Sequence, residues 1–208
     1  MKKFIVPMLF LSLALILGCQ EQSDVTKTTP APSVNEGQTQ VDQNKEQTQV
    51  DQNQEQSQVE EFSIKANGEI IALHDLDTEV NLEQVLGKPL SQDIEEVKGD
   101  TLTGSFLKKL TYDGLEMELF SPKGDGKTYW IMTMSVSKKG YATSKGVELG
   151  NTVQEMKDAY PGIKIAEDGR TDPNNCAYEI SNQLKYDYLV FEVKDGVVSQ
   201  IKLFNKIP

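Results

Sequence analysis

The sequence predicts a sheet-rich α+β domain in which short helices pack on an antiparallel sheet. Alternating apolar and polar residues indicate several strands, and Asn-Gly and Asp-Gly pairs indicate tight turns between neighbouring strands. Two short apolar-periodic segments with capping residues indicate the helices. The same order of elements occurs in residues 62–140 and 141–208, which predicts two similar halves in tandem within one domain over 62–208.

The first half begins with a hairpin signal. Its predicted elements are a hairpin over residues 62–73, a helix over 81–86, and strands over 107–120 and 128–136. The hairpin turns at Asn67-Gly68, a pair that favours the left-handed backbone of a two-residue turn. The helix ends at Gly87, because glycine accepts the conformation that terminates a helix. Apolar residues on both faces of the strand over 128–136 predict a central strand covered by a helix on one side.

The second half opens with a helix that has clear boundaries. Its predicted elements are a helix over residues 152–160 and strands over 177–180, 185–193 and 197–204. Thr152 and Glu155 have the spacing of a capping box, in which each side chain bonds the other residue's backbone amide. Pro161-Gly162 ends the helix, and Asp195-Gly196 supplies the turn between the last two strands.

Sequence identity between the halves supports a duplication. Residues 110–119 and 184–193 share leucine, tyrosine, aspartate, leucine and glutamate at the same spacing. A stretch this short is weak evidence by itself, but the helix–strand–strand order around it repeats as well. An internal duplication therefore explains the pattern best.

The segment from Gly150 to Gly162, followed by antiparallel strands, resembles the repeated unit of the beta-lactamase inhibitor protein-like fold. The likeness covers residues 75–208, and the first half departs from it with Asn81 where the second half has Thr152. The resemblance implies a short helical layer on a sheet, often duplicated in tandem. It does not carry inhibitory activity with it, since a fold does not fix a function.

The N-terminal sequence predicts localisation at a membrane. Lys2 and Lys3 precede the apolar run 4–17, which would rise only about 21 Å as a helix and so predicts a signal peptide over 1–18. Ile16-Leu17-Gly18-Cys19 resembles a bacterial lipobox, which implies cleavage before Cys19 and a lipid on its sulfur. That lipid is a thioether-linked diacylglycerol, with palmitate also expected, and its two acyl chains suffice to anchor the protein stably outside the cytoplasm. The small, tethered design favours a Gram-positive host.

Residues 19–61 predict a disordered tether. A nine-residue Gln-rich repeat carries one valine per unit, too little apolar surface to offset the entropy of ordering. The whole chain has a net charge of -11, which disfavours binding to nucleic acid and leaves the lipid as the contact with the membrane.

Cysteine and histidine usage leaves little for catalysis. With Cys19 lipidated, Cys176 is the one remaining thiol, so no internal disulfide can form, and a small buried side chain is expected there. His74 is the only histidine and is expected to be an ordinary loop residue. A zinc site of histidines and cysteines is therefore disfavoured, and neither a metal nor a cofactor is expected.

Two groups of carboxylates keep a rival function open. Glu116 and Glu118 share one strand face about 7 Å apart, a separation compatible with paired acid–base work, although a solvated face is the simpler interpretation. The Asp168–Asn175 loop clusters oxygen atoms that could bind calcium, but turn chemistry explains the same residue types. These groups define the alternative of a cell-envelope enzyme or a metal-dependent sensor.

The aromatic residues support the preferred hypothesis. Tyr112, Tyr129, Trp130, Tyr186 and Tyr188 fall on the predicted strands, where exposed aromatics form good contact surface for a protein partner. Completion of the core is the alternative role for each of them. The sequence therefore predicts a non-catalytic binding module for a protein or cell-envelope ligand. Inhibition of a wall enzyme is a further alternative.

Overall fold

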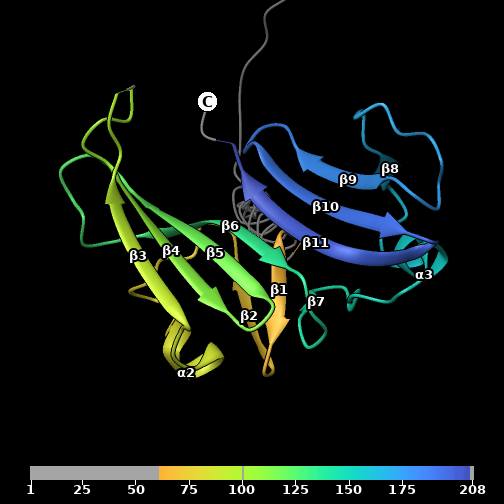
Figure 1. Cartoon of the computed structure of the whole chain (residues 1–208), viewed down its shortest axis with the longest axis horizontal. Coiled ribbons are helices and arrows are strands. Elements are labelled where there is room, and N and C mark those ends of the chain that lie inside the picture. Colours follow the sequence, from red (N-terminus) through yellow and green to blue (C-terminus); the bar gives the residue numbers. More distant parts are fainter. Residues whose placement is uncertain (1–60, 100, 207–208) are drawn as a thin grey trace, which may run out of the picture. The chain divides into compact units, whose positions relative to one another are not determined.

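The computed structural model describes residues 61–99 and 101–206, and within them the chain forms two antiparallel sheets and two short helices (Figure 1). The small sheet has the order β2-β1-β7 and comprises β1 (Ser63–Ala66), β2 (Glu69–Ala72) and β7 (Ala142–Thr143). The large, eight-stranded sheet has the order β3-β4-β5-β6-β11-β10-β9-β8. Its strands are β3 (Ser91–Glu96), β4 (Phe106–Tyr112), β5 (Leu115–Ser121), β6 (Trp130–Val136), β8 (Lys164–Ile165), β9 (Ala177–Asn182), β10 (Asp187–Lys194) and β11 (Val197–Asn205). The sheet-rich α+β prediction is confirmed.

The predicted hairpin and both helix boundaries are confirmed. Asn67 and Gly68 have φ values of 51° and 89°, as a two-residue turn between β1 and β2 requires. Helix α2 (Leu82–Leu86) begins where the Asn81 side chain accepts the Gln84 amide hydrogen, and Gly87 caps its end. These bonds satisfy amides that the first turn of a helix leaves without partners.

Helix α3 (Val153–Ala159) has the predicted capping box. The Glu155 amide donates to Thr152 Oγ1 at 3.2 Å, and the Thr152 amide donates to Glu155 Oε2 at 2.7 Å. Met156 is fully buried on the face that the helix turns to the core. The helix is too short to be stable alone, so the cap and this burial together hold it in place.

The prediction of a single strand over residues 107–120 is wrong. The chain instead forms β4 and β5, joined by a tight turn at Asp113-Gly114. Gly114 has a φ of 82°, and a Cβ there would lie 2.2 Å from Cβ of Lys138. A side chain at this position would clash, so the turn between β4 and β5 requires glycine.

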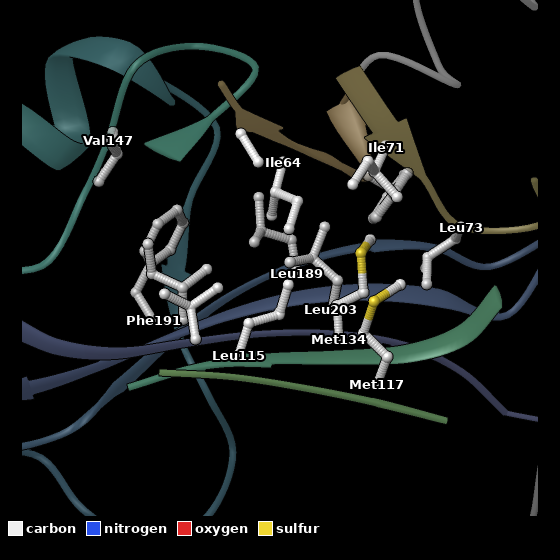
Figure 2. Packing of buried hydrophobic residues seen from close by; sticks show 14 of the residues in the cluster. Ile64, Ile71, Leu73, Leu115, Met117, Met134, Val147, Leu189, Phe191 and Leu203 are labelled. Atoms are coloured by element: carbon white, nitrogen blue, oxygen red, sulfur yellow. The ribbon is translucent and has the colours of Figure 1, made fainter. Parts of the chain in front are cut away.

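The core lies between the two sheets (Figure 2). Ile64 and Ile71 of the small sheet face Met117, Met134 and Leu203 of the large sheet. Each such aliphatic side chain contributes about 1.5–3 kcal/mol when fully buried. One face of the large sheet is therefore covered, and we call the opposite one the outer face.

Candidate interaction surface

Two of the five aromatic residues proposed as contact surface are buried. Tyr112 and Tyr129 are 5% and 3% exposed, and both belong to the core. Burial raises the pKa of each phenol. Lys108 places Nζ 3.8 Å from the centre of the Tyr129 ring. The expectation that these two tyrosines form contact surface is corrected, because no partner could reach them.

Trp130, Tyr186 and Tyr188 retain exposure. Trp130 and Tyr188 are half-buried, and each precedes a fully buried core residue, so alternation places both on the outer face. Tyr186 is 45% exposed and lies in the turn before β10 with a φ of 57°. Only Trp130 and Tyr188 therefore belong to the sheet surface itself.

Two further aromatic residues join them. Phe120 pairs with Trp130 across β5 and β6, with ring centres 5.6 Å apart, and because it is only 7% exposed it supports the Trp130 ring rather than offering contact surface itself. Phe204 pairs with Tyr188 across β11 and β10, and these rings stack 5.0 Å apart with 7° between their planes. We call these four residues the aromatic band. Sequence reasoning missed Phe120 and Phe204, although the alternation along their strands could have placed them on the outer face.

His74 supports one end of the aromatic band. Its ring stacks on Trp130 with centres 5.2 Å apart, and its Nε2 lies 2.8 Å from Oδ1 of Asp187. The Asp187 side chain is 4% exposed and also accepts a hydrogen bond of 2.9 Å from Asn205 Nδ2. His74 thus connects the loop after β2 to β10 and β11, a specific contact that the sequence did not predict.

The paired carboxylates lie on the outer face of β5. Glu116 is exposed, Glu118 is half-buried, and their neighbours Leu115, Met117 and Leu119 point into the core. This arrangement agrees with the expectation that the two acids occupy the solvated side of the strand. Their part in catalysis stays a hypothesis.

The Asp168–Asn175 loop is held by its own side chains. Arg170 bonds Asp168 and also Glu192 on β10, both within 2.8 Å. Asp172 accepts hydrogen bonds of 2.9 Å from Asn175 Nδ2 and from the Asn174 amide, as turn chemistry predicts. These bonds lower the pKa of Asp168 and of Asp172. Across residues 61–99 and 101–206, no group of three acidic, histidine or cysteine side chains is placed to hold a metal ion.

Cys176 is fully buried, as expected for a small core residue, and burial raises the pKa of its thiol.

Two of the surface clefts lie next to residues already described. One of about 550 Å³ opens beside Tyr188 and Lys206, and Nζ of Lys206 lies 4.5 Å from the centre of the Tyr188 ring. Another of about 380 Å³ lies between α2 and β4, and Lys108 and Asp77 form an ion pair on its wall.

No known family model matches the chain, and no curated protein or solved structure proved similar to it. The predicted signal peptide, the predicted lipidation site Cys19 and the predicted tether up to residue 60 lie outside the described residues. In the part of the chain that is described, no helix has the length and apolar character needed to cross a bilayer.

Proposed function

We propose that this protein is a non-catalytic binding module, anchored by lipid outside the cytoplasm, that contacts a protein partner through the outer face of its large sheet. The observation that carries the proposal is the aromatic band. Its members come from four neighbouring strands, β5, β6, β11 and β10, so hydrogen-bonded backbone fixes their spacing. Aromatic side chains on a rigid sheet bury a large contact area with little loss of conformational entropy.

The lipobox and tether support the location. The Ile16–Cys19 motif supplies the anchor, and a flexible tract of some 40 residues has a mean span of about 35–40 Å, which would hold the sheet clear of the lipid headgroups. A tethered module of this kind suits capture of a neighbouring envelope protein.

We further propose that the domain consists of two similar halves. Three backbone hydrogen bonds tie residues 74–77 to the start of β6, and three tie residues 150–153 to the start of β11. The first set is His74 N to Ile131 O, Ile131 N to Asp75 O and Asp77 N to Tyr129 O; the second is Gly150 N to Val198 O, Val198 N to Asn151 O and Val153 N to Gly196 O. The loop residues of the second set follow their counterparts in the first set by one constant number of positions. The strand residues follow theirs by another constant number.

The strand order supports the same proposal. From one edge of the large sheet to its centre the strands are β3, β4, β5 and β6, and from the other edge they are β8, β9, β10 and β11. Both series follow the order of the chain, and β6 meets β11 in the middle. Ser135 and Lys202 pair at this junction, with Met134 opposite Leu203 and Val136 opposite Ile201. Exchange of the two halves about the Ser135–Lys202 pair maps these contacts onto one another, as expected for a duplication.

Site-specific photo-crosslinking tests the binding proposal. A photoreactive residue replaces Tyr188 in the tagged full-length protein, and Leu184, which is 92% exposed in the preceding turn, serves as the matched control position. We expect one dominant partner from position 188, little from position 184, and loss of the partner in the Cys19→Ala protein. Equal products from both positions, or none, would contradict the proposal.

The rival hypothesis is an envelope enzyme or metal-dependent sensor that uses Glu116, Glu118 or the Asp168–Asn175 loop. It requires calcium to raise the melting temperature, because a ligand that favours the folded state must stabilise it. A rise that Asp172→Asn abolishes would favour the sensor. Inhibition of a wall enzyme by the purified protein, lost in Tyr188→Ala, would instead identify the partner as that enzyme.

A further inference from the structure

Strand β3 forms a long edge of the large sheet, and the side of it that faces away from β4 is open. It pairs with β4 only, and all six of its residues are exposed. Leu90 and Ile94 are 74% and 51% exposed, which is unusual for large aliphatic side chains. Natural proteins normally protect such edges because the free backbone groups can pair with another chain.

The hydrogen-bonding register shows which groups are free. The Val97 amide donates to the Ser105 carbonyl at 2.9 Å, and the Cα pairing continues from Glu96 opposite Phe106 to Ser91 opposite Thr111. Because bonded and non-bonded pairs alternate in an antiparallel ladder, the odd residues of β3 bond β4. The N–H and C=O groups of Gln92, Ile94 and Glu96 therefore point away from the sheet.

The two faces of this edge differ chemically. Gln92 and Ile94 lie on the covered face by alternation, and Gln92 lines the cleft of about 380 Å³ together with Pro89 and Leu110. Asp93 and Glu95 lie on the outer face. An added strand would place alternate side chains against Ile94 and the mouth of this cleft on one face, and against carboxylates on the other.

The acidic side of the edge has little compensation. Lys109 bonds Glu95 at 3.0 Å, and the nearby Glu95, Glu118 and Asp93 raise the pKa of this lysine. One cation therefore stands among three carboxylates. A second copy pairing antiparallel on β3 would set Asp93 and Glu95 against the same acids, which is unfavourable. The tether from residue 20 to 60 carries an excess of acidic residues and is excluded by the same repulsion.

We propose that the β3 edge binds an extended cationic peptide segment by strand addition. Its backbone would bond the free groups of Gln92, Ile94 and Glu96. Its apolar side chains would contact Ile94 and the mouth of the cleft, and its alternate lysines or arginines would face Asp93 and Glu95. This recognition mode combines main-chain bonding with side-chain pockets on alternate positions. The site is separate from the aromatic band and does not depend on the function proposed for it.

The test measures binding of a capped hexapeptide of alternating lysine and valine to the full chain, by fluorescence anisotropy at low salt. The matched pair of variants is Gln92→Pro and Gln92→Ala. Proline removes an N–H that β4 does not use, so the strand can remain paired, whereas alanine keeps this N–H. We expect Gln92→Pro to weaken binding about tenfold and Gln92→Ala less than about twofold.

Two further measurements keep the proposal falsifiable if the proline variant folds poorly. Asp93→Asn with Glu95→Gln should weaken binding about fivefold, and salt at about 0.5 M should have a similar effect. In the unmodified protein, the peptide should slow hydrogen exchange at the amides of Gln92, Ile94 and Glu96. Protection confined to other strands, equal binding of a glutamate–valine peptide, or no binding would overturn the proposal.

Discussion

We expect His74→Ala to lower the free energy of unfolding by about 2 kcal/mol. A hydrogen bond to a charged group contributes about 1.5 kcal/mol at the lower end of its range, which applies here because the imidazole is 43% exposed. Loss of the stacking on Trp130 adds about 0.5 kcal/mol. Asp187 keeps its bond from Asn205, so the buried carboxylate is not left without any partner.

A glycine at this position should be less damaging than alanine. His74 has a φ of 71°, a left-handed conformation that costs a non-glycine residue about 1 kcal/mol. We therefore expect His74→Gly to be about 1 kcal/mol more stable than His74→Ala. Gly150 makes the corresponding backbone bond to β11, which shows that glycine is accommodated in such a loop.

Urea unfolding monitored by circular dichroism and by fluorescence of Trp130, the only tryptophan, measures these differences. A double-mutant cycle with Asp187→Asn isolates the bond to the carboxylate. His74→Ala should cost about 1 kcal/mol less in the Asn background, because the charge-assisted bond is already gone. An equal cost in both backgrounds would refute the reasoning.

Four other outcomes follow from local geometry. Gly114→Ala should destabilise by more than about 2 kcal/mol in thermal or urea unfolding, whereas Gly124→Ala, with a similar φ of 84° but no atom within 4 Å, should cost only about 1 kcal/mol. Thr152→Ala should cost about 1 kcal/mol through loss of the α3 cap. Backbone and side-chain bonds from Thr152 lower the pKa of Glu155, so the cost of Glu155→Gln should be present at neutral pH and disappear as the pH falls through that lowered pKa. A thiol reagent should modify Cys176 only as fast as the domain opens, and rapid modification under native conditions would contradict its burial.

Turns and caps were the features most accessible from the sequence. Asn67-Gly68, the Thr152–Glu155 box and Asp195-Gly196 each act through their immediate neighbours, so their chemistry is local. The same kind of signal was present at Asp113-Gly114, but apolar residues on both sides of it suggested an uninterrupted strand. Strand β3 gave no signal, since alternation arises from burial of one face and this strand buries neither.

The contact surface depended on information that local patterns lack. Tyr112 and Tyr188 both lie on strands, yet one is in the core and the other on the outer face. Alternation separates the two faces of a strand but does not say which of them the small sheet covers. The contact between His74 and Asp187 joins residues far apart in the chain, so only the tertiary structure could reveal it.

A comparison of the two edges of the large sheet favours a functional role for the open edge at β3. Under the proposed duplication β3 corresponds to β8, yet β8 has two residues and β3 has six. A short edge strand is a common protection against unwanted pairing, and β8 has it. The long edge at β3 instead leaves Leu90 and Ile94 exposed beside acidic residues. Its acids discourage pairing of like copies while permitting a basic strand, which is the selectivity that a peptide-binding edge requires.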